Sequence, residues 1–164
     1  MRIRQLTAAL LTTVVASTAI AAAVTPASAA PDSGKMTVYM AQTERNVLDL
    51  GATGSTIGDV VTGSGNVTKT KGGAPIGSFS YRSETVRVNI PGGIENRLST
   101  IWFSLPGGSL MASTVINVPS GTRPVKSQDY VILGGTGKYA GAAGDMTFTP
   151  LSPDDYKLTF RFTD

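Results

Sequence analysis

Cysteine and histidine are both absent from this chain of 164 residues. Their absence excludes a disulfide, a thiol nucleophile, a Ser-His-Asp triad and the usual kinds of zinc site. It also argues against a redox role or a bound haem, so we expect neither a metal nor a cofactor. Any catalysis must therefore rely on acidic side chains, lysine, arginine, tyrosine, serine, asparagine or backbone groups.

The start of the chain has the pattern of a secretory signal peptide. Arg2 and Arg4 supply positive charge, an apolar run follows over residues 6–24, and small residues at 27–29 suit cleavage. The apolar run is diluted by serine and threonine, so cleavage is favoured over a retained membrane anchor. The alanine-rich signal suits a bacterial exporter. We expect a secreted, extracellular protein with no membrane attachment in its mature form.

Cleavage at this point divides the chain into a signal peptide (1–29), a short flexible leader (30–35) and a single domain (36–164). Charged residues make up only 15% of the whole chain. Without Arg2 and Arg4, 12 basic residues face 11 acidic ones. The basic residues are scattered rather than clustered with aromatic side chains, so we expect no nucleic-acid partner.

The predicted domain has no sustained helical period, whereas alternating strand patterns recur with turn residues between them. Such a sequence predicts an all-β domain. Eight strands joined in order favour a single eight-stranded antiparallel β-barrel, with a sandwich as the alternative. A barrel also leaves no exposed strand edges, which matters in a chain without disulfides. The expected strands cover residues 36–42, 57–70, 76–90, 98–105, 110–118, 129–133, 145–149 and 156–162.

A glycine-rich segment separates two of these strands and reads, over residues 132–144, Ile-Leu-Gly-Gly-Thr-Gly-Lys-Tyr-Ala-Gly-Ala-Ala-Gly. It is not a phosphate-binding loop, because no glycine stands five residues before Gly137 and Tyr139 replaces the metal-binding serine or threonine. It is not a dinucleotide fingerprint either, because Ala140 takes the place of the last glycine. The glycines instead predict a tight crossing between strands of a barrel.

The stretch from Gly134 to Gly144 resembles the corresponding segment of plant allene oxide cyclases and dirigent proteins. Two shorter pieces, residues 58–61 (Gly-Asp-Val-Val) and 75–77 (Pro-Ile-Gly), are similar to the starts of the second and third strands of the cyclases. The resemblance spans residues 36–162 and implies an eight-stranded barrel that assembles as a homo-oligomer, a trimer or a dimer. It also implies a small apolar ligand whose cyclisation or stereoselective coupling the barrel directs, as in a cofactor-independent cyclase or isomerase.

Arg82 and Glu84 are candidate catalytic residues on the third expected strand. They share a strand face with the valines that follow. If those valines point inward, both charges lie inside the barrel, where Glu84 could act as a base. The alternative interpretation turns Phe79 and Tyr81 inward and leaves Arg82 and Glu84 as a surface pair.

Asn66 is the third candidate catalytic residue, because it lies near the position where the plant cyclases carry an asparagine that holds the reacting oxygen. Other positions depart from the two families. Ser83 lies near the position of a pocket cysteine in the plant cyclases, and Lys138 and Ala143 replace an acid and an arginine of the dirigent proteins. The resemblance therefore does not extend to plant-type chemistry.

Four residues are candidate ligand contacts. Tyr81 and Ser83 belong to the third expected strand, Trp102 to the fourth, and Phe160 to the apolar face of the last. The fourth strand carries apolar side chains on both faces, so its outer face could also pack against another subunit.

Three functions fit these observations. In the first, the barrel binds a small apolar molecule and directs its cyclisation or coupling by holding it in a reactive shape. In the second, the protein is a non-catalytic extracellular carrier of a hydrophobic ligand. In the third, it is a secreted interaction protein whose barrel is packed solid. The fold alone does not choose among them.

Overall fold

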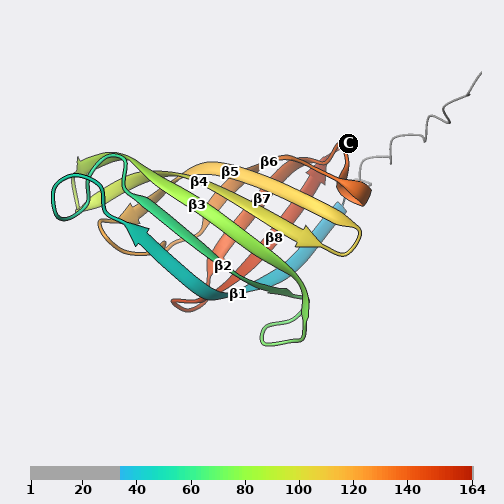
Figure 1. Cartoon of the computed structure of the whole chain (residues 1–164). Coiled ribbons are helices and arrows are strands. Elements are labelled where there is room, and N and C mark those ends of the chain that lie inside the picture. Colours follow the sequence, from blue (N-terminus) through green and yellow to red (C-terminus); the bar gives the residue numbers. More distant parts are fainter. Residues whose placement is uncertain (1–33, 164) are drawn as a thin grey trace, which may run out of the picture.

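The computed structural model describes residues 34–163, which form a closed barrel of eight antiparallel strands (Figure 1). Each strand pairs with its neighbours in the chain, and β1 pairs with β8 to complete the barrel. The predicted all-β barrel is thereby confirmed, while the predicted signal peptide lies outside the described residues. The elements are β1 (Gly34–Leu48), β2 (Val60–Thr68), β3 (Pro75–Ile90), β4 (Ile94–Leu105), β5 (Gly108–Pro119), β6 (Gln128–Gly135), the short 3-10 helix η1 (Gly137–Tyr139), β7 (Ala143–Pro150) and β8 (Asp155–Thr163). No helix within residues 34–163 has the length and apolarity needed to cross a membrane.

Two strands extend four or more residues beyond one end of their predicted ranges. β1 continues past Gln42 to Leu48, because a bulge at Thr43 absorbs one residue and restores the pairing with β2. β4 begins at Ile94 rather than at Leu98, because its polar first residues pair with β5 as regularly as the apolar ones do. This earlier start brings three polar residues, 95–97, into the barrel wall.

Alternating side chains of the strands fill the barrel interior. On β4, Ile101, Phe103 and Leu105 are buried, and on β8 the inward series includes Leu158 and Phe160. The rings of Phe103 and Phe160 meet edge to face with their centroids 5.4 Å apart. The middle of the barrel is therefore a packed core.

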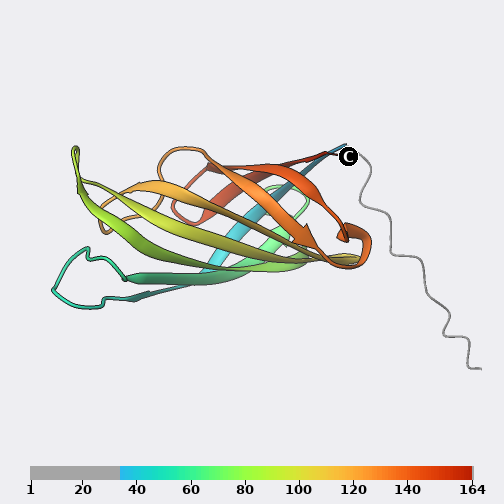
Figure 2. The same ribbon diagram turned by 90° about the horizontal axis from the view of Figure 1, so that it is seen from above.

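The up-and-down topology places the connections at two opposite ends (Figures 1 and 2). One end carries the connections over residues 49–59, 91–93, 120–127 and 151–154, and we call it the arginine end after Arg45, Arg97 and Arg123, which lie there. The other end carries residues 69–74, 106–107 and 136–142 together with both ends of the described chain, and we call it the glycine end.

Close backbone contacts build the glycine end. Gly137 has a φ of 59°, and an added Cβ would run into the carbonyl oxygen of Gly107. The same carbonyl accepts a hydrogen bond from Lys138 N at 2.8 Å. The buried ring of Tyr139 then stacks on Phe162, with centroids 6.5 Å apart. The glycine-rich segment thus carries a turn that lays Tyr139 onto the core.

Candidate functional site

A narrow throat of about 40 Å³ lies within the barrel at the arginine end. Strands from all around the barrel contribute to it, because their inward side chains converge where the packed core stops. Its apolar walls are supplied by Met40, Val61, Ile101, Ile116, Pro124 and Phe148. Its polar groups are supplied by Gln42, Arg45, Tyr81, Ser83, Arg97, Ser99, Thr122, Arg123, Tyr130 and Tyr156. Ten of the sixteen lining residues carry polar groups, yet most of the surface that faces the throat is apolar, as in many ligand sites.

Three hydroxyl groups on one wall of the throat form a hydroxyl trio: Ser83 on β3, Ser99 on β4 and Tyr130 on β6. Ser83 Oγ donates a hydrogen bond to Ser99 Oγ at 2.8 Å, and the Tyr130 hydroxyl donates to the same oxygen at 3.1 Å. Both bonds are buried. Within residues 34–163 these are the two bonds of Ser99 Oγ, so its own hydrogen remains to donate to a ligand.

The tyrosines of the throat are hydrogen-bond donors rather than bases at neutral pH. Burial raises the pKa of Tyr130 to about 12, although its bond to Ser99 acts in the opposite direction. Burial also raises the pKa values of Tyr81 and Tyr156, and nearby arginines oppose both shifts. All three rings therefore present neutral hydroxyl groups to the throat.

A buried ion pair joins two residues of β4, Glu95 and Arg97, which are 0% and 5% exposed. Arg97 Nε lies 2.6 Å from Glu95 Oε1, and Arg97 Nη1 donates to the carbonyl oxygen of Thr122 at 3.0 Å. The second carboxylate oxygen, Glu95 Oε2, is buried and has no hydrogen-bond partner within residues 34–163. Such a pair resists disruption, because removing one partner leaves a buried charge uncompensated.

The ion pair lies between the throat and a wider cavity of about 540 Å³, which we call the vestibule. Arg45, Val61 and Arg97 line both spaces. Glu95 and the connection over residues 49–59 belong to the vestibule alone. The arginine end is therefore a funnel whose wide outer part is more polar than its narrow inner part.

Asp59 holds the connection between β1 and β2 in place. Its Oδ1 accepts a hydrogen bond from Leu50 N at 2.9 Å, and its Oδ2 accepts one from Thr56 N at 2.7 Å. These bonds stabilise the carboxylate and lower the pKa of Asp59. Its role is to fix one rim of the vestibule, as an aspartate at a turn commonly does.

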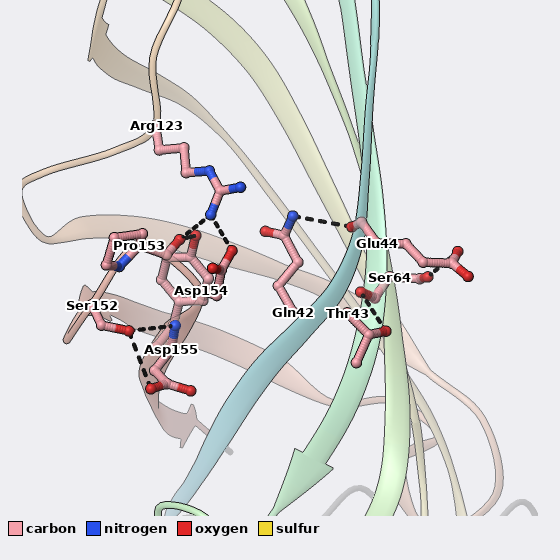
Figure 3. Close-up of polar contacts among 10 residues, drawn as sticks. Gln42, Thr43, Glu44, Ser64, Arg123, Ser152, Pro153, Asp154 and Asp155 are labelled. Carbon is pink, nitrogen blue, oxygen red and sulfur yellow. Dashed lines mark hydrogen bonds and ion pairs between the residues drawn. The ribbon is translucent and has the colours of Figure 1, made fainter.

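Arg123 ties two loops together at the mouth of the throat (Figure 3). Its guanidinium contacts the Asp154 carboxylate and the Pro153 carbonyl oxygen, so the β5–β6 loop is fastened to the β7–β8 loop. The bond to Asp154 raises the pKa of Arg123. We call this contact the clasp. Because Arg123 also lines the throat, the clasp borders this space.

Three of the four predicted ligand contacts lie inside the barrel and one lies outside. Tyr81 and Ser83 line the throat, whereas Phe160 is fully buried in the packed core. Trp102 lies on the outer face of β4 and is 43% exposed. Trp102 does not line the throat, because it alternates with the inward Ile101 and Phe103.

The three predicted catalytic residues all lie on the outside of the barrel. Arg82 and Glu84 form an exposed pair on β3, with Arg82 Nη2 3.2 Å from Glu84 Oε2. Of the two interpretations, the one with Phe79 and Tyr81 inward and a surface Arg–Glu pair is the observed one. Asn66 is exposed on β2, and it points outward because its neighbour Val67 points inward. The structure does not bring these three residues to the throat.

Sequence reasoning missed Glu95, Arg97, Ser99 and Arg123. The first three could have been found, because the inward series 101, 103 and 105 of the fourth strand continues backward to 99, 97 and 95. The charge of Glu95 and Arg97 and the turn residues before them made residues 94–97 resemble a loop, whereas Ser99 lay within the expected strand. Arg123 gives no such signal, since it belongs to a loop without periodicity.

Comparison of the sequence with protein-family models gives no match, and comparison with the curated proteins gives none either. Solved structures do match the fold. A pyocyanin demethylase has a TM-score of 0.67 and 21% identity over 79% of this chain and 100% of its own. The Diels–Alderase AbmU from Streptomyces koyangensis has a TM-score of 0.62 and 16% identity over 80% of this chain and 70% of its own.

A dirigent protein, the pterocarpan synthase GePTS1, matches with a TM-score of 0.54 and 14% identity over 79% of this chain and 82% of its own. The predicted likeness to dirigent-type barrels is thus confirmed for the fold. At these identities the likeness concerns the backbone, so the chemistry must be argued from the throat and its side chains.

Proposed function

We propose that the throat binds a small, largely apolar molecule and directs its cyclisation or stereoselective coupling. The observation that carries this proposal is the apolar throat with the hydroxyl trio on one wall. The names of the structural neighbours support it, since they include a Diels–Alderase and a dirigent protein. Export from the cell, for which residues 1–29 argue, is part of the same proposal.

The chemistry suits a cofactor-independent reaction. Holding a flexible molecule in its reactive shape removes much of the entropic barrier to ring closure. The free hydrogen of Ser99 would donate to a carbonyl or ether oxygen of the ligand, and Ser83 and Tyr130 would hold Ser99 in place for this bond. A fixed donor of this kind stabilises negative charge that develops on the oxygen during reaction.

Entry of the ligand requires the throat to widen. Its present volume of about 40 Å³ is far below the several hundred Å³ of a typical ligand pocket. The clasp is the contact whose opening would widen it, because Arg123 is held by surface groups rather than by the core. We therefore expect ligand exchange to follow the opening of the β5–β6 loop.

Native mass spectrometry of the protein purified from the culture fluid of its host tests the proposal. We expect a retained apolar compound, and we expect Ser99→Leu, which fills the throat, to lose it. Thr100→Leu is the matched control, because Thr100 is the next residue of β4 and faces outward. Thermal unfolding of both variants checks that they are folded. The proposal fails if Ser99→Leu retains the compound as the wild type does, or if the wild type neither carries a compound nor takes one up from a culture extract.

A non-catalytic carrier would pass the binding test, and turnover separates the two functions. Incubation of the retained compound, or of its open-chain precursor, with protein should give a cyclised or coupled product in an enzyme. Saturable binding without conversion would instead assign the protein as a carrier of a hydrophobic ligand.

The outer wall suggests a second function, contact between copies of the chain. Leu98 and Val115 are direct neighbours on β4 and β5, and Trp102, Val131 and Leu133 extend their apolar surface across β4 to β6. We propose that this face joins protomers into a trimer or dimer. Light scattering on the wild type and on Leu98→Lys tests this, and a monomeric wild type would contradict it.

A further inference from the structure

The vestibule contains a buried carboxylate oxygen that the protein itself leaves without a donor. Glu95 is 0% exposed, and its Oε2 has no hydrogen-bond partner within residues 34–163. Native proteins rarely leave a buried polar atom in this state, and the exceptions call for an explanation. Glu95 belongs to the lining of the vestibule, so a ligand there that displaces the groups covering Oε2 can supply the missing donor.

Two of the other charged groups that line the vestibule, Asp59 and Arg97, already have partners. Both oxygens of Asp59 accept bonds from the β1–β2 connection. Arg97 donates to Glu95 Oε1 and to the carbonyl oxygen of Thr122, so its guanidinium is committed to the protein. At Glu95 the unmet demand is thus for a hydrogen-bond donor.

The charge of the vestibule favours a cationic donor. Three acids line it, Asp49, Asp59 and Glu95, against two arginines, Arg45 and Arg97. The lining therefore carries an excess of one negative charge. A protonated amine would satisfy both the orphaned oxygen and this excess, and a charge-assisted hydrogen bond is stronger than a neutral one.

The cavity also has room and apolar surface for the rest of such a ligand. Its volume is about 540 Å³, and Val47, Val61 and Val88 form part of its lining. A compact hydrocarbon body can lie on these valines while its amino group reaches Glu95. We propose that the vestibule is a binding site for a small primary amine, whose ammonium group donates to Glu95 Oε2. This inference goes beyond the proposed function, which concerns the throat.

Three probes that share one ring and differ in their polar group test the site. Cyclohexylamine, cyclohexanol and cyclohexanecarboxylate, titrated at neutral pH and followed by amide chemical shifts, compare a cationic, a neutral and an anionic group. We expect the amine to bind roughly tenfold or more tightly than the alcohol, with shifts centred on the starts of β2 and β4, and the carboxylate to bind weakest.

Glu95→Gln should reduce amine affinity roughly tenfold or more and bring it close to that of the alcohol. Glu84→Gln is the matched control, since it makes the same change in the exposed Arg–Glu pair on the outer wall, and it should bind the amine as the wild type does. If Glu95→Gln fails to fold, the double variant Glu95→Gln/Arg97→Met removes the unpaired arginine and takes its place.

Several outcomes overturn the inference. Equal affinity for the alcohol and the amine would show that the site does not recognise the ammonium group. Amine binding that is unchanged in Glu95→Gln, or that shifts amide signals only outside the vestibule, would show that Glu95 does not bind the amine. Absence of measurable binding by all three probes would mean that the vestibule is not a site for this class of ligand. The variant Ser99→Leu tests whether the throat retains its compound, and it does not test amine binding in the vestibule. The two proposals therefore fail separately.

Discussion

The two ends of the barrel are built by different means. At the glycine end the backbone makes close contacts, as where Lys138 N bonds to the Gly107 carbonyl oxygen, and the ring of Tyr139 packs on Phe162. At the arginine end, charged side chains add to the backbone hydrogen bonds, through the Glu95–Arg97 pair and the clasp. Both ends hold open volume, about 520 Å³ at the glycine end and about 540 Å³ in the vestibule, but at the arginine end the cavity borders the throat inside the barrel. The difference distinguishes an end that is shaped by close backbone contacts from an end where charged side chains border the throat.

Removal of Arg97 should have the largest effect on stability and would sharpen this comparison most. Arg97→Met leaves the Glu95 carboxylate buried without its partner, which typically costs about 3–5 kcal/mol. Chemical denaturation of the variant and the wild type measures the loss. The double variant Glu95→Gln/Arg97→Met, which has no buried charge, should recover most of the stability. A double variant as unstable as the single one would show that packing rather than charge holds this end.

Gly137→Ala tests the glycine end with the next largest effect. The substitution puts a Cβ against the Gly107 carbonyl oxygen at a left-handed φ of 59°, so we expect a loss of roughly 2–4 kcal/mol. The matched control at the arginine end is Gly93→Ala, whose φ of 67° is similar but whose Cβ would meet nothing within 4 Å. It should cost about 1 kcal/mol. Equal losses in thermal or chemical unfolding would contradict the close-contact account of the glycine end.

The same contrast explains how much the sequence could predict. Glycines mark places where the backbone turns or approaches another segment closely, so residues 132–144 pointed to a barrel crossing. Strand alternation gave the all-β class and the eight strands in order. Both signals depend on local backbone requirements, which a single sequence displays directly.

The site was harder to predict, because it depends on which face of a strand each residue occupies. Arg82 and Glu84 on β3 and Glu95 and Arg97 on β4 are both charged pairs spaced by two residues, yet the first pair lies outside and the second inside. If the alternation of inward and outward residues shifts by one position along a strand, an inward pair becomes an outward one and an outward pair an inward one. The clasp and the vestibule also need loops that the strands bring together only in three dimensions.

Tyr130 should make the arginine end sensitive to alkaline pH. Because its folded-state pKa is raised to about 12 from the ordinary value near 10, the unfolded chain loses this proton first as the pH rises. Stability is therefore full below pH 10 and falls by roughly 2–3 kcal/mol between about pH 10 and pH 12. Denaturation at a series of pH values measures this slope.

Tyr130→Phe is the control for the alkaline slope. It should cost about 1 kcal/mol at neutral pH through the lost bond to Ser99, and it should flatten the alkaline fall. Any alkaline loss of stability that remains in Tyr130→Phe would come from Tyr81 and Tyr156, since burial raises their pKa values as well. An unchanged slope would mean that Tyr130 is not the group that titrates.

The clasp should contribute least to stability and most to ligand exchange. Arg123 and Asp154 are partly exposed, with side chains 33% and 58% accessible, so Arg123→Ala should cost no more than about 1 kcal/mol. The β5–β6 loop would then be free of the β7–β8 loop, and the retained compound should leave the throat faster. Stopped-flow exchange against excess ligand measures this rate, with Arg82→Ala in the exposed pair of the outer wall as the matched control. Unchanged exchange in Arg123→Ala would place the entrance elsewhere, whereas a large loss of stability would make the clasp a part of the fold and so weaken the division between the two ends.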